Sequence, residues 1–264
     1  MIMHHHMNLT LRACVTTVVA ILSFAAGDAN AQGFQWPDEP ENLQVLPDDV
    51  TGRKLGGVMR GFASSLGVRC EHCHVGEGSD LSEFDFVSDE KPTKLKARLM
   101  LQMVDAINQE HLSQLADIEV GSSPALEVTC MTCHRKQARP VMLQDILTSK
   151  VGDDGIDAAE AKYRELREQY YGGFSFDFGP GALTSLGEQF GDAGDFASGI
   201  RFIELEIEMN GESASVYYTL GGIQASAKMT TDAIESFTRG LAMAPDGWKP
   251  FFQKELDLLT AEED

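Results

Sequence analysis

The sequence predicts a mainly α-helical protein built in two parts, and three observations support this fold class. Apolar residues recur at helical spacing over residues 51–66 and 93–116. The pentapeptide C-x-x-C-H occurs twice, each time downstream of one of these helices. The last stretch of the chain, from about residue 183, repeats with a period of 34, which is typical of stacked helical hairpins.

The composition limits the classes of function. The chain has 264 residues, which suits one or two domains, and 41 acidic against 21 basic residues give it a formal net charge of −20. A nucleic-acid partner would need a basic surface, so we expect none. The acidity suits docking onto a basic partner surface, although a solvated acidic surface explains it equally well.

The N-terminal segment, residues 1–31, is predicted to be a cleavable signal peptide. Residues 1–6 look like an upstream start or a tag remnant, and a short apolar run then leads to Ala29-Asn30-Ala31, an A-x-A cleavage site. Cleavage after Ala31 would place the mature chain in the periplasm or elsewhere outside the cytoplasm. The apolar run is too short to span a bilayer, and we expect no membrane span in the mature chain.

Residues 51–66 form the first predicted helix, which follows a proline-bearing arm. Gly67 stands where a glycine often ends a helix. The first pentapeptide, Cys70-Glu71-His72-Cys73-His74, comes three residues later, and a polar loop is expected over 76–90. The apolar residues on one face of this helix are Leu55, Val58, Met59, Phe62 and Leu66.

A second helix is predicted over residues 93–116, with Pro92 in its first turn. After a further turn comes the second pentapeptide, Cys130-Met131-Thr132-Cys133-His134. The two halves share one plan, a helix with methionine on its apolar face followed by C-x-x-C-H, so we interpret them as a duplicated unit of about 60 residues. The apolar face of the second helix holds Leu95, Leu99, Met103 and Ile107, widened by Met100, Val104 and Leu115.

The pentapeptide is the attachment signature of c-type haem. Two thiols three residues apart suit thioether bonds to the two vinyl groups of one haem, and the following histidine is then held beneath the iron. A four-thiolate zinc site and a redox dithiol compete with this interpretation, but the first does not need the histidines and the second is expected within a βαβ pattern. The residues predicted to hold two covalent haems and their iron are Cys70, Cys73, His74, Cys130, Cys133 and His134.

The second axial ligand of each iron decides the function. A methionine or histidine there closes the iron and favours electron transfer, whereas an open position permits catalysis. Met59 lies on the apolar face before the first motif, and Met103 lies on the matching face before the second. Met100 and His111 compete with Met103, and filling the core is an alternative role for each methionine.

The residues after the second motif are predicted to form a connection and then a helical repeat. A short helix is expected over 141–147, a hinge over 152–155 and a helix over 157–171, followed by a glycine-rich boundary at 172–181. The predicted domains are the signal peptide 1–31, a di-haem cytochrome domain 32–150, a linker with a connecting helix 151–180, and tetratricopeptide-like repeats 181–264.

The repeat prediction rests on the second copy more than on the first. Ala233, Phe237 and Pro245 complete the tetratricopeptide pattern there, whereas Gly199 and Gly211 replace the usual alanine and proline in the first copy. A helix over 249–259 would cap the stack. A plain pair of helical hairpins is the alternative.

Four stretches around the motifs, 58–62, 66–76, 100–108 and 128–135, together resemble half of the four-haem cytochrome subunit of photosynthetic reaction centres. In that family a methionine on the helix before C-x-x-C-H is the sixth ligand of most haems, which implies Met59 for the first haem and Met103 for the second. This chain has two motifs rather than four and a different second half. The resemblance therefore does not imply service to a photosynthetic reaction centre.

These observations predict an exported di-haem cytochrome c that carries electrons between redox protein partners. The C-terminal repeats are expected to dock a protein partner or a second copy of the chain, because such repeats present a concave surface. The alternatives are a di-haem enzyme such as a peroxidase, which needs one open iron, and a haem-bearing docking scaffold.

Overall fold

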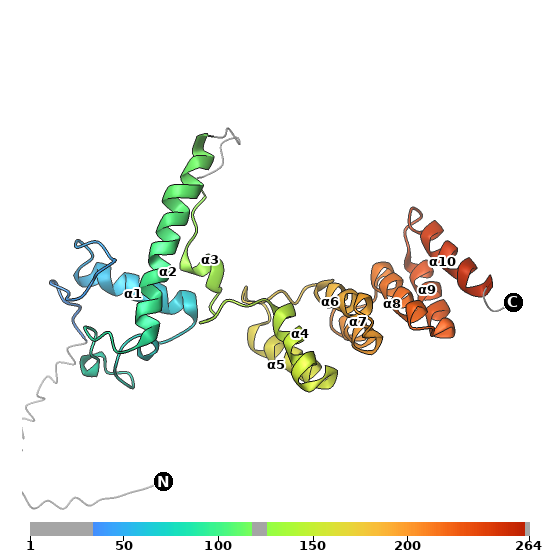
Figure 1. The fold of residues 1–264 in the computed structure, drawn as a ribbon, viewed down its shortest axis with the longest axis horizontal. Coiled ribbons are helices and arrows are strands. Elements are labelled where there is room, and N and C mark those ends of the chain that lie inside the picture. The colour runs from blue at the N-terminus through green and yellow to red at the C-terminus, as the bar shows by residue number, and fades with distance from the viewer. Residues whose placement is uncertain (1–33, 118–125, 262–264) are drawn as a thin grey trace, which may run out of the picture. The chain divides into compact units, whose positions relative to one another are not determined.

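The structure, a computed structural model, describes residues 34–117 and 126–261 (Figure 1). The predicted mainly α-helical class is confirmed, since helices dominate the described residues, where the isolated bridge between Val75 and Asp85 is the β feature. The chain separates into two compact units, residues 1–35 and 36–264, and all elements named below belong to the second. The predicted signal peptide lies outside the described residues.

Helix α1 (Gly52–Leu66) ends at Gly67, which takes the left-handed conformation with φ 66°, as predicted. Its first half packs on Trp36, because a Cβ at Gly56 would come within 2.6 Å of the indole Nε1. A 3₁₀ turn, η1 (Cys70–His72), opens the first motif. The expected polar loop at 76–90 contains a second such turn, η2 (Leu81–Glu83), and buries Phe84, so part of this loop is packed.

Helix α2 (Pro92–Ala106) starts with Pro92 in its first turn, as predicted. It continues through a π segment, η3 (Ile107–His111), and a 3₁₀ segment, η4 (Leu112–Asp117). The predicted extent of about 93–116 is therefore confirmed, but the backbone is not uniform. Single π turns are rare and occur often at functional sites. The second motif itself forms helix α3 (Cys130–His134).

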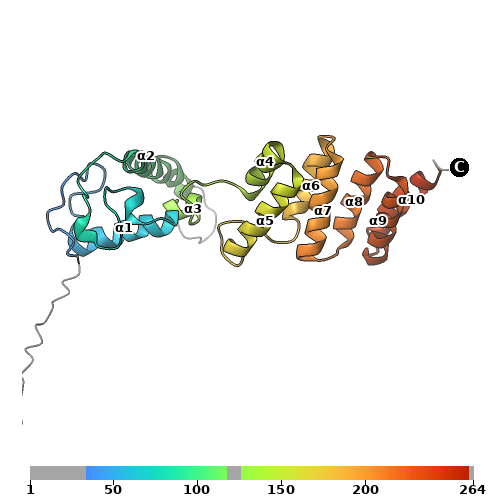
Figure 2. The same ribbon diagram turned by 90° about the horizontal axis from the view of Figure 1, so that it is seen from below.

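The rest of the described chain is a succession of helices, most of which pack on the next helix in sequence (Figure 2). The helices predicted near 157–171 and 249–259 are confirmed. Helices α6 with α7 and α8 with α9 fall on the two copies of the 34-residue period, and their identity as tetratricopeptide repeats stays a prediction. The elements are α4 (Leu143–Asp154), α5 (Ile156–Tyr170), α6 (Ala182–Asp192), α7 (Phe196–Asn210), α8 (Ala214–Ser226), α9 (Thr230–Met243) and α10 (Lys249–Ala261).

The predicted short helix at 141–147 and the hinge at 152–155 are wrong in extent. Helix α4 runs on to Asp154, and the break is the single residue Gly155, with φ 87°. The helix extends this far because Leu147 and Val151 both pack into the core beneath it. That packing outweighs the cost of a glycine inside a helix, which is about 1 kcal/mol.

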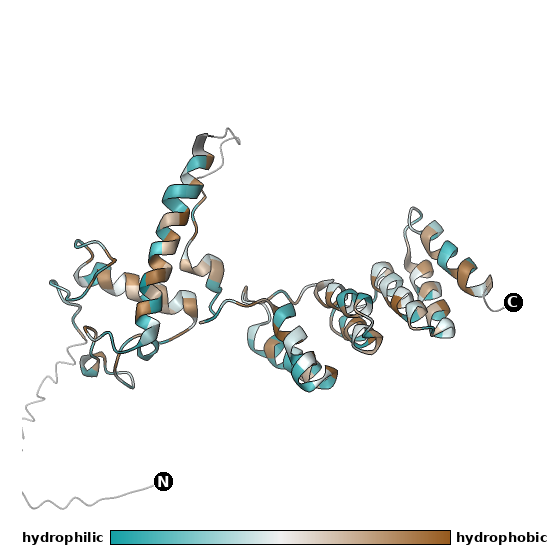
Figure 3. Cartoon of the chain, viewed as in Figure 1, coloured by the Kyte–Doolittle hydropathy of each residue, from teal (hydrophilic) through white to brown (hydrophobic). Residues whose placement is uncertain are grey.

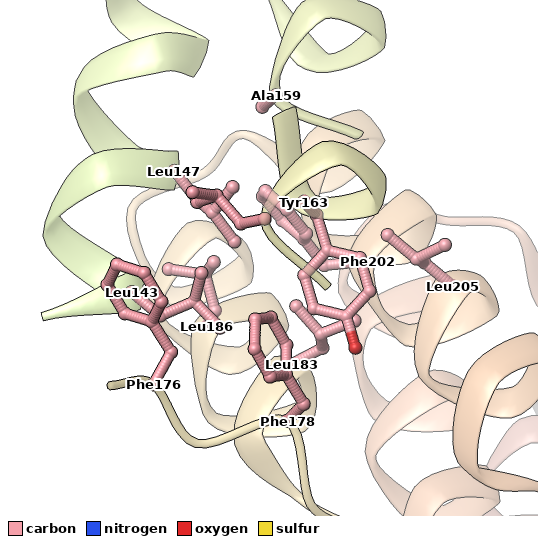
Figure 4. Packing of buried hydrophobic residues seen from close by; sticks show 11 residues of the cluster. Leu143, Leu147, Ala159, Tyr163, Phe176, Phe178, Leu183, Leu186, Phe202 and Leu205 are labelled. Carbon is pink, nitrogen blue, oxygen red and sulfur yellow. The ribbon is translucent and has the colours of Figure 1, made fainter. Parts of the chain in front are cut away.

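The largest core lies where α4, α5, α6 and α7 meet, and its side chains point toward one another in Figure 4. Residues 151–180, expected to be a linker with a connecting helix, supply Tyr163, Phe176 and Phe178 to this core. Phe176 and Phe178 lie in the segment between α5 and α6, and both side chains reach the same interior. The other buried members are Leu143, Leu147, Ala159, Leu166, Leu183, Leu186, Phe202 and Leu205.

Candidate functional site

The region around the two motifs has almost no buried apolar side chains of its own. Among its described residues, up to residue 140, the buried hydrophobic side chains are Val50, Leu55 and Phe84. The apolar face of α2 is instead exposed, and Figure 3 shows that apolar residues recur along this helix. The exposed fractions on this face are 44% for Leu95, 63% for Leu99, 42% for Met100 and 44% for Met103.

The first motif is held by the start of α2. The carbonyl oxygens of Glu71 and His72 accept hydrogen bonds from Lys91 Nζ and Thr93 Oγ1. Residues 71 and 72 therefore have fixed backbone positions, although η1 itself is only one turn long. The polar side chains at the start of α2 thus orient the segment between Cys70 and Cys73.

His74 is half-buried at the end of the first motif. Its ring is 4.9 Å from that of Phe86, edge to face, and its Nδ1 atom is buried without a hydrogen-bond partner. Burial, aided by the nearby charges of Lys94 and Lys91, lowers the pKa of His74 to about 4. The imidazole is therefore neutral at pH 7, which is the form that binds a metal ion.

The second motif is held by the π segment of α2. Asn108 Nδ2 donates to the carbonyl oxygen of Val128 (2.8 Å), and Asn108 Oδ1 accepts from the Val128 amide (2.8 Å). Thr129 then caps α3 in a reciprocal pair of bonds with Thr132. Sequence analysis gave Asn108 no role, although an asparagine inside a helix is a signal of side-chain bonding to other backbone groups.

His134 differs from His74 in having a fixed ring orientation. Its Nδ1 atom is 2.8 Å from the carbonyl oxygen of Gln137. Because a carbonyl oxygen only accepts, Nδ1 carries a proton, and Nε2 is the ring nitrogen left to bind a metal. The sequence does not predict the role of Gln137, since nothing local to this residue marks its backbone oxygen as a partner.

The turn after His134 joins the end of α1 to the second motif. The Lys136 amide donates to the Ser65 carbonyl oxygen (2.9 Å), and a Cβ at Gly67 would lie 2.2 Å from the Lys136 carbonyl oxygen. Arg135 and Lys136 both have positive φ, 48° and 65°. Such conformations cost about 1–3 kcal/mol each for residues other than glycine, so surrounding contacts must hold this turn.

The candidate distal ligands have different surroundings. Met59 is half-buried on α1, whose end packs against α3, while Met100 and Met103 are exposed on α2. His111 is exposed in the π segment, at the far end from the first motif. The assignment of Met59 and Met103, and the choice among Met103, Met100 and His111, stay predictions.

The cysteines do not gather into a cluster that would suit zinc. In residues 34–117 and 126–261, no group of three or more histidine, cysteine, aspartate or glutamate side chains lies close enough to hold a metal ion. Cys70, Cys73, Cys130 and Cys133 are all free of disulfides. Burial raises the pKa of the Cys73 and Cys130 thiols.

These residues fit haem well. A haem is a large apolar plate, and burying one leucine or methionine side chain fully is worth about 1.5–3 kcal/mol. The exposed face of α2 offers several such side chains beside two pairs of thiols, each pair followed by a histidine. With haem bound, the group would supply a one-electron iron centre.

Comparison with known proteins points the same way. Residues 36–152 match the family described as the photosynthetic reaction centre cytochrome C subunit. The chain is also 34% identical over 110 residues to cytochrome c-554 of Chloroflexus aurantiacus, a match that covers 41% of this chain and 23% of that protein. The chain therefore spans about a quarter of the relative's length. The part of the chain that the structure describes contains no helix long and apolar enough to cross a membrane.

Proposed function

We propose that this protein, whose residues 36–152 match the reaction-centre cytochrome c family, is an exported di-haem cytochrome c that carries electrons between redox proteins. The family implies haem-based electron transfer. The number of haems, the export and the partners are our own inferences from the residues. The observation that carries the proposal is the exposed apolar face of α2 beside two C-x-x-C-H motifs.

Each motif provides a complete set of attachment groups. Cys70 and Cys73 would bind one haem and Cys130 and Cys133 the other, with His74 and His134 as proximal ligands. The neutral His74 ring supports this assignment, and so does the Nδ1–Gln137 bond of His134, which leaves Nε2 as the nitrogen that would face the iron. A bound haem would cover Leu95, Leu99 and their neighbours on α2.

Methionine ligation favours electron transfer over catalysis, because it closes the sixth position of the iron. We assign Met59 to the first haem and Met103 to the second, each on the helix that precedes its motif. Thioether ligation stabilises ferrous iron, so both haems are expected to have relatively high potentials.

The localisation and the partners follow from charge and sequence. Covalent haem attachment fits the predicted signal peptide with cleavage after Ala31, which places the mature chain in the periplasm or elsewhere outside the cytoplasm. A net charge of −20 favours a donor or acceptor with a basic docking surface. The tetratricopeptide-like tail would hold a protein partner or a second copy.

Purified protein tests the proposal directly. Two covalent haems per chain and a methionine-type absorption band for each are the expected results. Replacing Met59 or Met103 with alanine should remove one band each and open one iron to carbon monoxide. Matched replacements, Met100→Ala and His111→Ala, should leave both bands intact. Carbon monoxide binding by the unaltered protein would favour the peroxidase alternative, and zinc without covalent haem would refute the proposal.

A further inference from the structure

We propose that Ser175 and Gln137 position the proximal histidine of the second haem, so that the C-terminal helices influence the potential of that haem. The inference rests on the proposed function, because it concerns the haem expected at the second motif. Ser175 lies 41 positions after His134 in sequence. The structure nevertheless connects the two through an unbroken set of hydrogen bonds.

The first connection is the carbonyl oxygen of Gln137. This oxygen accepts a hydrogen bond from His134 Nδ1, with 2.8 Å between the two atoms. The position of the oxygen therefore sets the rotation of the imidazole ring. The Gln137 amide in turn donates to the His134 carbonyl oxygen, also at 2.8 Å. Residues 134–137 thus form one closed turn, and a shift in the turn changes the bond to the ring.

The turn needs outside support, because Arg135 and Lys136 both adopt the left-handed conformation. The Lys136 amide is fixed by the Ser65 carbonyl oxygen of α1. The other contacts that hold the turn come from residues after α5. Lys136 Nζ lies 5.2 Å from the centre of the Phe174 ring, which belongs to the segment between α5 and α6.

Ser175 supplies two hydrogen bonds to the turn from that same segment. Its hydroxyl donates to the Arg135 carbonyl oxygen (2.8 Å), and its own carbonyl oxygen accepts from Gln137 Nε2 (2.9 Å). Ser175 is buried, and its neighbour Phe176 is anchored in the core formed by α4 to α7. The turn is therefore tied to a rigid part of the tail.

The first motif has no equivalent arrangement among the described residues. His74 Nδ1 is buried without a partner, and the bonds to its motif come from the start of α2. A hydrogen bond donated by the second ring nitrogen makes an imidazole a stronger electron donor to a metal. Weakening the bond at His134 should therefore make the second iron easier to reduce and leave the first unchanged.

The test is spectroelectrochemical titration of the haem-loaded full chain. Ser175→Ala removes the hydroxyl bond to Arg135, and Gln137→Ala removes the side-chain bond to Ser175. The matched control is Ser236→Ala, since Ser236 is equally buried in the tail and its hydroxyl bonds only Gln224 (2.7 Å). A Cys130→Ala/Cys133→Ala variant, lacking the second haem, identifies which reduction wave belongs to it.

We expect both Ser175→Ala and Gln137→Ala to raise the potential of the second wave alone, by up to about a tenfold change in the reduction equilibrium, or 59 mV. The double variant should shift it less than the sum of the two, because the bonds act on one turn. Faster hydrogen exchange at the Lys136 and Gln137 amides should accompany the shift, and Ser236→Ala should change neither measurement.

The outcomes separate the two proposals. If both haems are attached and neither variant moves the second wave, or if Ser236→Ala moves it equally, positioning by Ser175 and Gln137 is refuted while the di-haem function stands. If the unaltered protein carries no haem at the second motif, the proposed function fails and this inference fails with it. Should Ser175→Ala not fold, Gln137→Ala decides, since the removed amide is half-buried near the surface of the turn.

Discussion

The cytochrome region, up to residue 140, and the C-terminal helices, from α4 onward, differ in how many apolar side chains they bury. Of the buried hydrophobic residues, 20 lie between Leu143 and Phe252, against only three among the described residues up to 140. The C-terminal helices bury their apolar faces against one another, whereas α2 leaves its own exposed. When a cofactor fills the interior of a protein, the polypeptide alone has few buried apolar side chains there. An exposed apolar helix face without a partner can therefore indicate where the cofactor binds.

The largest effect should come from removing both attachment sites. We expect the variant with Cys70, Cys73, Cys130 and Cys133 all replaced by alanine to lose the fold of the cytochrome region and keep that of the tail. The reason is that α2 then has nothing to cover its apolar face. Hydrogen exchange by mass spectrometry would show protection confined to residues after about 143. Full protection of α1 and α2 in this variant would show that the cytochrome region folds without haem, contrary to our expectation.

A large cavity in the tail should have the converse effect. Phe202, on α7, is fully buried in the core formed by α4 to α7, so Phe202→Ala should lower the free energy of unfolding of the tail by about 3–5 kcal/mol. The absorption spectrum of both haems should stay as it was. Phe251→Ala is the control, since Phe251 is 58% exposed, and it should change stability by less than about 0.5 kcal/mol. Loss of haem bands in Phe202→Ala would show that the two regions unfold together.

A smaller effect is expected at the contact between the two halves of the cytochrome region. Gly67→Ala places a Cβ 2.2 Å from the Lys136 carbonyl oxygen, at a residue whose φ is 66°. Unfolding of the haem-bearing region should become easier by about 1–3 kcal/mol, because an alanine is strained there and the neighbour is backbone. Gly57→Ala, with open space around its Cβ, should be neutral or stabilising in the same denaturation measurement.

The smallest effect should be a pH dependence at Asp89, which joins the arm near Asn42 to α2. Arg98 bonds this carboxylate at 2.8 Å, with help from Lys94 and Asn42, and these bonds hold its pKa well below the ordinary value of 3.8. A carboxyl group whose folded-state pKa is lowered stabilises the fold above its unfolded-state pKa and ceases to do so as the pH falls. Asp89→Asn should therefore destabilise at pH 7, and its unfolding curve should approach that of the unaltered protein below about pH 4.

Asp49→Asn serves as the control for Asp89. Asp49 pairs only with the neighbouring Lys54 on the surface and joins no separate segments. Its replacement should shift the midpoint of denaturation very little at either pH, as is usual for exposed ion pairs. A shift as large as that of Asp89→Asn would mean that net charge, rather than the link to α2, governs stability in this region.

The sequence predicted the helices whose apolar spacing and end signals agree. Met59 and its neighbours marked α1, Gly67 marked its end, and Pro92 marked the start of α2. The sequence did not predict contacts between residues that are far apart along the chain. The Asn108–Val128 and Gln137–Ser175 bonds join segments 20 and 38 residues apart, which local periodicity does not encode.

Two further differences have packing as their cause. Gly152 and Gly155 suggested a hinge, yet contacts of Leu147 and Val151 with the core extend α4 past Gly152 to Asp154. The glycine-rich stretch around Phe176 suggested a boundary because its composition is typical of loops, whereas its aromatic side chains fill the largest core. The haem residues could be proposed from the motif alone, since their spacing follows from the cofactor's own chemistry.

The exposed face of α2 has a consequence for how the cell handles newly made copies. A chain that has not yet received its haems would display a contiguous apolar strip, the kind of surface that chaperones and proteases bind. A chain with both haems attached would hide it. Quality control would then depend directly on haem attachment, because the same residues that contact the cofactor would be recognised for degradation when it is missing.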